Sequence, residues 1–331
     1  MHGVMSAMNS QGLHYAWWQY HQNTTSPDEY ALYYKDGLGG WTAKPEEVAA
    51  FTYYMTQNLA TLQAAAHAAA TAAGATLFYI KNDLSNVFQD SAGTPVSALN
   101  DPIGKINAVI GTGNISQSTA GAKPLLSAGV NQYGWKLDGV DDYLQLNNTY
   151  FASGDDTIVI CAGTPANSTT NRIMFNCGTA NSNPRYPYLG ITAGDLPTVS
   201  WRGDDALLRD CTGTTNCNNR PIVLTGSKIG ADKVLYVNGL QEGSVNTSAV
   251  GSLASLTRSR VGSAANTSGY FIGSMAMVCI SKTMTLQQRQ DIERFGAFLV
   301  GAAYMAPTGV GGHSSAWNDS DTWNDSDTWT D

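Results

Sequence analysis

Charged residues are scarce in this chain of 331 residues, of which only 13% are Asp, Glu, Lys or Arg. Lys and Arg number 18 against 26 Asp and Glu, which gives a formal net charge of −8. A protein that binds duplex nucleic acid needs clustered Lys and Arg to neutralise phosphates. We therefore expect no nucleic acid among its partners.

Long apolar runs are also missing, and no stretch is long and apolar enough to span a bilayer. Residues Met1 to Ser10 contain neither a Lys or Arg nor the continuous apolar run of a secretory signal. We expect a soluble protein that is made in the cytoplasm and does not insert into a membrane.

Cysteines are few and odd in number, and none lies in the C-x-x-C spacing of zinc sites. Cys161, Cys177 and Cys279 lie within strand-like runs, where a free Cys usually behaves as a small buried hydrophobe. Cys211 and Cys217 bracket the short segment T-G-T-T-N, so their state is open between free thiols and a disulfide.

What the chain has in quantity is turn chemistry, with 34 Gly and many Ser, Thr and Asn between short apolar runs. This composition is typical of many short strands joined by tight turns, for example at Asn238-Gly239 and Gly194-Asp195. Two antiparallel sheets packed face to face bury such strands. The strands that we expect are Leu77–Ile80, Trp135–Asp138, Tyr143–Leu146, Thr157–Ala162, Arg172–Cys177, Tyr188–Thr192, Thr198–Arg202, Pro221–Ser227, Lys233–Asn238, Arg258–Gly262 and Phe271–Ser281.

A long helix is predicted from Pro45 to Ala73, because Pro suits a first helical position and Gly74 a stop. Its apolar residues recur at alternating spacings of three and four. Two interpretations stay open, an amphipathic helix packed on its own domain and a self-associating bundle. The seam consists of Val48, Phe51, Met55, Leu62, Ala65, Ala69 and Ala72.

A second, short helix is predicted after Thr285, because T-L-Q-Q is a capping box. Its apolar positions include Ile292, Phe295 and Phe298. We expect this helix to close one edge of the sandwich.

Three segments in this order resemble one known family. They are Gly134 to Leu146 (G-W-K-L-D-G-V-D-D-Y-L-Q-L), Val234 to Val245 (V-L-Y-V-N-G-L-Q-E-G-S-V) and Arg260 to Lys282, which the capped helix follows. Together they resemble the laminin-G-like, concanavalin A-like domain of tailed-phage virion structural proteins, over roughly residues 76 to 303. The resemblance implies a mainly β fold, an antiparallel two-sheet jelly-roll sandwich with an N-terminal helix and a short C-terminal helix. It also implies an irregular lead-in before the first core strand, with Ile110 to Ala122 as a loop.

The chain then divides into an aromatic docking arm (1–44), an assembly helix (45–74), the sandwich (75–303) and a Trp/Asp hexapeptide-repeat tail (304–331). The arm is rich in rings but poor in aliphatic residues, and the tail repeats W-N-D-S-D-T. Aromatic residues contribute strongly to the energetics of protein interfaces, so we expect both segments to contact other proteins. The alternatives are a floppy leader for residues 1–44 and a disordered acidic tail for the repeat. The expected assembly residues are Tyr15, Trp17, Trp18, Tyr20, Trp41, Phe51, Met55, Leu62, Trp317, Trp323 and Trp329.

Catalytic motifs are missing, so we predict that the chain is not an enzyme. Between residues 75 and 303 the only glutamates are Glu242 and Glu293, and glycoside hydrolysis needs a pair of carboxyl groups. Asp138, Asp141 and Asp142 have Gly and Asp neighbours that make turn formation the simpler explanation. We expect no cofactor. The repeated Asp residues could bind Ca²⁺, but the sequence has no calcium-binding-loop motif to support such a site.

A glycan site needs aromatic platforms beside amide and carboxylate groups. The segments N-S-N-P-R-Y-P-Y and W-R-G-D-D contain both, although the rings could instead pack in the sandwich. The candidate residues are Asn183, Arg185, Tyr186, Tyr188, Trp201, Arg202, Asp204 and Asp205.

These features predict a bacteriophage virion protein, a head or tail fibre or decoration subunit, whose lectin-like sandwich attaches to host-surface glycan. The expected partners are other virion proteins of capsid, neck or tail, further copies of the chain, with a trimer favoured, and host surface polysaccharide. The alternatives are a cementing protein that binds no sugar and a polysaccharide depolymerase.

Overall fold

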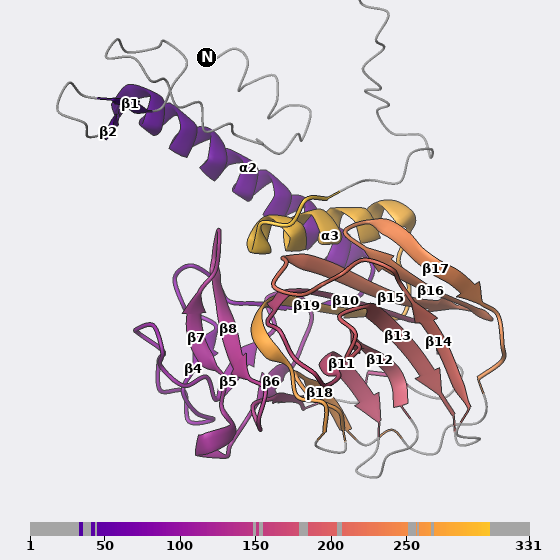
Figure 1. The fold of residues 1–331 in the computed structure, drawn as a ribbon. Coiled ribbons are helices and arrows are strands. Elements are labelled where there is room, and N and C mark those ends of the chain that lie inside the picture. Colours follow the sequence, from indigo (N-terminus) through magenta and orange to yellow (C-terminus); the bar gives the residue numbers. More distant parts are fainter. Residues whose placement is uncertain are drawn as a thin grey trace, which may run out of the picture.

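Two antiparallel sheets packed face to face form a β-sandwich with two helices on one side (Figure 1). This computed structural model describes residues 33–35, 41–43, 45–147, 150–151, 155–178, 185–203, 207–250, 256, 258–265 and 268–304. The predicted mainly β sandwich with an N-terminal and a C-terminal helix is confirmed.

The eight-stranded sheet has the order β17-β16-β15-β10-β19-β8-β7, and β3 pairs with β19 beside β8. Its central strands are buried on both faces, which explains their continuous apolar runs. The strands are β3 (Thr76–Tyr79), β7 (Leu125–Ala128), β8 (Tyr133–Asp138), β10 (Thr157–Pro165), β15 (Ile222–Ile229), β16 (Asp232–Val237), β17 (Leu240–Asn246) and β19 (Ile272–Ser281).

The nine-stranded sheet has the order β14-β13-β12-β11-β18-β9-β6-β5-β4. A separate hairpin pairs β1 (Tyr33–Lys35) with β2 (Trp41–Ala43). The strands of the larger sheet are β4 (Val87–Phe88), β5 (Lys105–Asn107), β6 (Asn114–Ser116), β9 (Leu144–Leu146), β11 (Arg172–Gly178), β12 (Arg185–Ile191), β13 (Pro197–Arg202), β14 (Leu208–Thr212) and β18 (Arg258–Val261).

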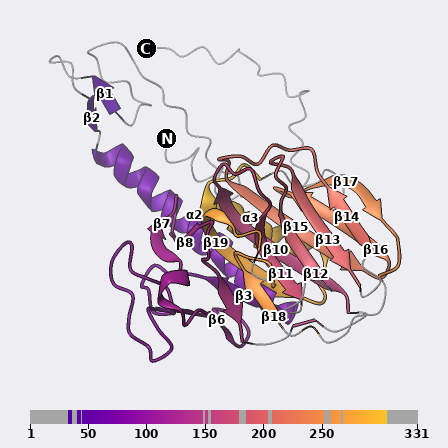
Figure 2. The same cartoon turned by 60° about the horizontal axis from the view of Figure 1, so that its bottom comes forward.

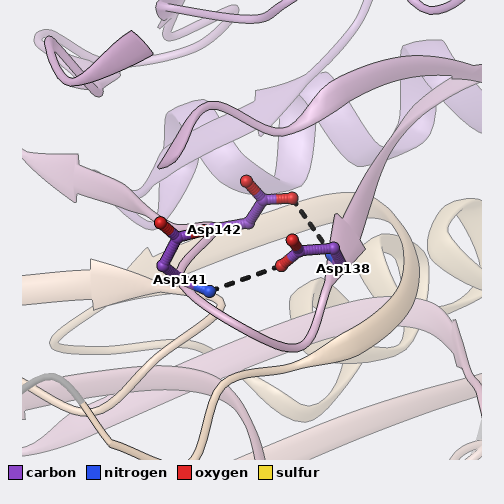
Figure 3. A group of neighbouring side chains, drawn as sticks. All are labelled: Asp138, Asp141 and Asp142. Carbon is purple, nitrogen blue, oxygen red and sulfur yellow. Dashed lines mark hydrogen bonds between the residues drawn. The ribbon is translucent and has the colours of Figure 1, made fainter. Parts of the chain in front are cut away.

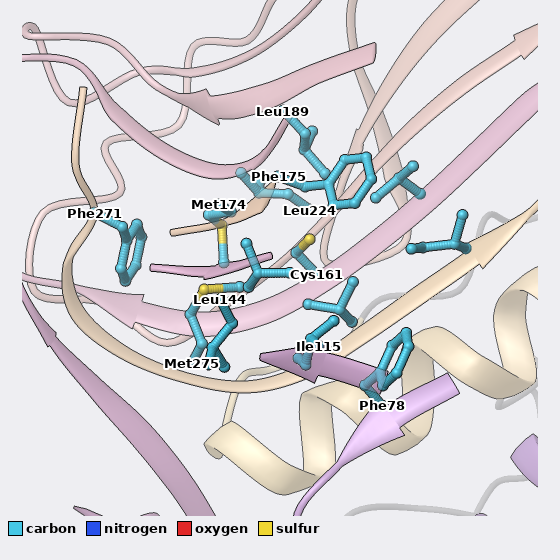
Figure 4. Close-up of a cluster of buried hydrophobic side chains, with 14 of the residues drawn as sticks. Phe78, Ile115, Leu144, Cys161, Met174, Phe175, Leu189, Leu224, Phe271 and Met275 are labelled. Atoms are coloured by element: carbon cyan, nitrogen blue, oxygen red, sulfur yellow. The ribbon is translucent and has the colours of Figure 1, made fainter. Parts of the chain in front are cut away.

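The core lies between the two sheets and is built by alternation along each strand. In β9, for example, Leu144 and Leu146 are buried in the core while Gln145 between them is half-buried. Figure 4 shows Leu144 with Phe175 and Leu224 in this cluster of buried side chains. The side chains that alternate with these core residues therefore lie on the outer face of each sheet.

The helix α3 (Leu286–Val300) covers the outer face of the eight-stranded sheet. The predicted capping box at Thr285 and Gln288 is present. Ile292, Phe295 and Phe298 pack over β10, β15 and β19, so the expectation that this helix closes an edge is wrong. A helix with a broad apolar face buries more surface on the flat of a sheet than along one edge strand.

The helix α2 (Pro45–Ala72) is confirmed, and its second half packs on α3 and β3. Leu62 is 8% exposed within this cluster, so its predicted role in assembly between subunits is wrong. The burial follows Leu62, Ala66, Ala69 and Ala70, whereas Ala72 of the predicted seam is exposed. The first half of α2 projects beyond the sandwich in both views (Figures 1 and 2). The side chains of Phe51, Met55 and Trp41 lie outside the described parts, as do Tyr15, Trp17, Trp18, Tyr20, Trp317, Trp323 and Trp329.

A hydrogen-bonded trio joins α2 to the sheet. The Tyr79 hydroxyl lies 2.9 Å from His67 Nε2 and accepts from Gln63 Nε2 at 2.8 Å. Burial, and then the charge of Lys81, lower the pKa of His67. The fold therefore favours the neutral imidazole.

Acidification should accordingly loosen the docking of α2. Because the pKa of His67 is lowered on folding, its contribution is complete above its ordinary value of 6.5 and is lost as the pH falls through the lowered value. We expect this group to lower the free energy of unfolding as the pH falls from 7 to 5. Urea denaturation at the two pH values measures it. A His67→Gln variant should lack this component, and an unchanged pH dependence in that variant would contradict the assignment.

Several strands were missed in the sequence. β14 is an edge strand, and polar residues dominate its sequence L-R-D-C-T. The predicted loop from Ile110 to Ala122 contains the short strand β6. Of the strands in the lead-in, β4, β5 and β6 belong to the nine-stranded sheet and β7 belongs to the eight-stranded sheet. Strands of two to four residues are too short for alternation to stand out.

All five cysteines are free and buried, including Cys211 and Cys217. The interpretation of Cys161, Cys177 and Cys279 as buried hydrophobes is confirmed. Burial raises the pKa of the Cys279 thiol to about 12, so it has no thiolate character near neutral pH.

Candidate functional site

The two large rings of the predicted glycan site lie in the core. Trp201 and Tyr186 are both fully buried between the sheets. Trp201 Nε1 donates to Thr157 Oγ1 at 3.1 Å, and the Tyr186 hydroxyl donates to the Asp155 carbonyl at 2.5 Å. Neither ring offers a face to a sugar, so their prediction as binding platforms is wrong.

Strand alternation places other members of that predicted site on the outer face. In β13, Val199 and Trp201 are in the core, so Ser200 and Arg202 face outward. Tyr188 pairs with Ser200, and Arg185 pairs with Arg202, in the register of β12 and β13. Asn183, Asp204, Asp205 and the side chain of Arg185 lie outside the described parts of the chain.

Directly paired residues form a continuous row across the outer face of the whole nine-stranded sheet. Each member is the cross-strand partner of the next, and none is aliphatic. The flanking positions on these strands point into the core. We call this set the polar row, and its members from β4 to β14 are Phe88, Lys105, Ser116, Gln145, Arg260, Asn176, Tyr188, Ser200 and Asp210.

Exposure varies along the polar row. Phe88, Lys105, Ser116 and Gln145 are half-buried, and so can be reached from solvent. From β18 to β13 the row is covered, since Arg260 to Ser200 are at most 7% exposed. Part of this cover is the segment after β18, whose Ala265 amide donates to Asn176 Oδ1 at 2.8 Å. Asp210 on the edge strand β14 is exposed as well, at the far end beyond the covered part. The continuous accessible part of the row therefore consists of its members on β4, β5, β6 and β9.

Cations and rings meet at this accessible part. Lys105 Nζ lies 4.9 Å from the ring centre of Phe88. Arg260 Cζ lies 4.0 Å from the ring centre of Tyr143, which is half-buried at the start of β9. Contacts of this kind hold a cation in place over an aromatic face. Burial is the main reason why the pKa of Arg260 is lowered, and the neighbouring charge of Arg258 contributes.

Unpartnered polar atoms gather on the same face. Within the described part of the chain, Ser200 Oγ, Arg202 Nε and Arg260 Nε are buried without a hydrogen-bond partner. Buried polar groups are normally satisfied by protein, water or ligand. These three atoms lie in the covered part of the sheet, from β18 to β13.

The carboxylates of Asp138, Asp141 and Asp142 form a second cluster, at the corner between β8 and β9, with oxygens within 4.8 Å of one another (Figure 3). Asp142 Oδ2 accepts from the Asp138 amide at 3.0 Å, and Asp138 Oδ1 accepts from the Val140 amide at 2.8 Å. The predicted role in turn formation is confirmed. Burial, aided by the two neighbouring carboxylates, raises the pKa of Asp142 to about 6.

Both glutamates of the sandwich are occupied. Glu242 Oε2 accepts from the amides of Thr214 and Thr215, at 2.8 and 3.0 Å, and so fixes the loop before β15. Glu293 is a residue of α3 and is fully buried. It accepts from Thr225 Oγ1 at 2.6 Å, from Arg289 Nη1 at 3.2 Å and from the Tyr304 hydroxyl at 3.0 Å. Neither carboxylate is placed as one of a pair of acid and base groups.

No protein-family model and no curated protein matches the sequence. Among solved structures, the binding domain of Paraclostridial Mosquitocidal Protein 1 is similar over 64% of this chain and 52% of its own, with 12% identity and a TM-score of 0.44. Domain 4 of AbnA, a GH43 extracellular arabinanase from Geobacillus stearothermophilus, in complex with arabinotriose, is similar over 56% and 88%, with 14% identity and a TM-score of 0.41. The Ruminococcus gnavus IT-sialidase CBM40 bound to alpha2,3 sialyllactose is similar over 42% and 81%, with 15% identity and a TM-score of 0.36.

This chain thus spans about half the length of the mosquitocidal protein's binding domain. Similarities at this level decide nothing about the ligand of this chain. The resemblance to tailed-phage structural proteins stays a prediction. Among the described helices, none is both long enough and apolar enough to cross a membrane.

Proposed function

We propose that the chain is a bacteriophage virion protein, a head or tail fibre or decoration subunit, that binds a host-surface glycan along the accessible part of the polar row. The observation that carries this proposal is the unbroken register of polar and aromatic side chains across nine strands. Strands lie about 4.8 Å apart, so the three steps from Phe88 to Gln145 in the accessible part extend over roughly 14 Å. An extended chain of sugars can contact several members at once.

The side chains of the accessible row suit sugar hydroxyls. Gln145 offers amide donors and an acceptor, Ser116 offers a hydroxyl, and Phe88 offers a ring held against Lys105. They lie on strands within a sheet, and elements of this kind hold side chains more firmly than loops do. Glycan recognition of this type needs no metal, cofactor or catalytic group.

Anchoring in the particle is the part of the proposal that rests on the two ends. The first half of α2 projects from the sandwich, away from the outer face of the nine-stranded sheet (Figure 1). We assign the aromatic arm (1–44), this helix and the Trp/Asp repeat to contacts with capsid, neck or tail proteins and with other copies of the chain, as a trimer. Such an arrangement leaves the sandwich at the particle surface.

Paired substitutions on the two sheets test glycan binding. Lys105→Ala with Gln145→Ala should weaken binding on an array of host polysaccharides by roughly tenfold or more, because each lost polar contact costs about 0.5–1.5 kcal/mol. Lys136→Ala with Gln241→Ala is the matched control, since both residues are exposed on the eight-stranded sheet. No binding by the unaltered protein would refute the proposal and favour a cementing protein. Equal losses in both variants would contradict the assignment to the polar row.

Deletion of residues 1–44 tests the anchor. We expect the shortened protein to be absent from purified particles, because its rings no longer contact neighbouring subunits. Quantitative mass spectrometry of the particles measures its copy number. Incorporation at the normal level would show that the arm is dispensable.

A further inference from the structure

The strand β18 carries two arginines on the outer side of the sheet. Ser259 and Val261 are buried towards the core, so Arg258 and Arg260 share the outer face, roughly 7 Å apart along the strand. Arg258 is half-buried, and Arg260 is 3% exposed beneath the ring of Tyr143. We call these two residues the arginine pair.

The described residues provide no carboxylate for the arginine pair. The side chains with the largest electrostatic effect on Arg260 are Tyr143, Arg258 and Tyr270, and none of these is acidic. Its Nη1 donates to the Ala264 carbonyl at 3.3 Å, and its Nε has no partner. Among the described residues, the two like charges thus lie side by side with no carboxylate beside them.

This arrangement contrasts with that of four other basic residues of the sandwich, each of which lies beside a carboxylate. Arg289 pairs with Glu293 at 3.2 Å, and Arg294 with Asp291 at 3.4 Å. Arg172 pairs with Asp195, and Lys282 with Asp155 at 2.7 Å. The chain has more acidic than basic residues, 26 against 18, so a shortage of carboxylates in the sequence does not explain why the described residues place none beside the arginine pair.

A desolvated guanidinium without a counter-ion is unfavourable, and a ligand that brings an anion removes this penalty. The fork of N–H donors on Arg matches a carboxylate in two-point geometry. Tyr143 and Tyr270, both half-buried near Arg260, add aromatic surface on which a sugar ring can lie.

We propose that the arginine pair selects acidic saccharides, in which a sugar carboxylate binds Arg258 while Arg260, held by Tyr143, adds positive charge behind it. This inference rests on the proposed function, because it names the class of glycan that the polar row takes. Neutral polysaccharides would lack the group that compensates the two guanidinium charges.

A comparison of each acidic polysaccharide with its own neutral derivative tests the inference. The probes are polygalacturonate, hyaluronate and polysialate, each with a form in which the carboxylates are reduced to alcohols. Isothermal titration calorimetry with the full chain should show binding to at least one acidic form and at least tenfold weaker binding to its reduced form. Arg258→Gln should reduce affinity for that acidic form by roughly tenfold. Arg220→Gln, which removes an exposed charge from the loop before β15, should leave it unchanged.

The outcomes separate the two proposals. Equal binding of acidic and reduced forms would overturn the selection of acidic sugars and leave glycan binding intact. Equal losses in Arg258→Gln and Arg220→Gln would also overturn it, since general charge and not the arginine pair would then be responsible. Binding to neither form of any probe, in a protein that binds a neutral glycan on the array, would overturn it too. Binding to no glycan at all would overturn both proposals.

Discussion

Glu293→Ala is expected to lower the free energy of unfolding by roughly 3–5 kcal/mol, the cost typical of breaking a buried ion pair. Glu293 is fully buried and is the shared acceptor of Thr225, Arg289 and Tyr304. Its removal leaves the guanidinium of Arg289, which lies 3.6 Å from the ring centre of Tyr236, without a counter-ion. Urea denaturation followed by circular dichroism measures the loss.

The control lies on the same helix. Asp291 pairs with Arg294 at 3.4 Å, and both side chains are partly exposed. Because exposed ion pairs contribute about 0–1 kcal/mol, Asp291→Ala should change stability little. Similar effects of the two substitutions would show that the buried network does not hold α3 on the sheet.

Trp201→Ala is expected to be as damaging, with a loss of about 3–5 kcal/mol. The ring is fully buried in the core, and its removal also leaves the Thr157 hydroxyl without its donor. Any loss of glycan binding in this variant would therefore report a damaged core. Thermal denaturation should show a lower midpoint.

Leu207→Ala is the matched control in the same region, since Leu207 lies just before β14 and is 62% exposed. Substitutions at such positions usually change stability by less than about 0.5 kcal/mol. A Trp201→Ala protein as stable as Leu207→Ala would contradict the placement of the indole in the core.

The sequence predicted the long elements well because their signals are local. Pro45 and Gly74 bracket α2, and Thr285 with Gln288 caps α3, as expected. Asn238 and Gly239 have φ of 49° and 90°, the left-handed turn expected of an Asn-Gly pair. The edge strand β14 was missed because its sequence, L-R-D-C-T, has too few apolar residues to show a pattern.

The candidate site was predictable only in part. Tyr188 and Arg202 lie on the outer face, but sequence proximity placed Tyr186 and Trp201 beside them, and alternation sends these two inward. Lys105, Gln145 and Arg260 were not singled out, although Gln145 stands between two buried leucines in its strand. Their proximity depends on strand order and register, which no local pattern reveals.

Hydrogen exchange in the presence of a bound acidic polysaccharide tests the central claim most directly. The account predicts slower exchange in peptides covering β5, β6, β9 and β18, whose outer face carries the accessible polar row and the arginine pair. Peptides covering β15 and β16 in the other sheet should be unaffected. Protection confined to the eight-stranded sheet, or no protection at saturating ligand, would contradict it.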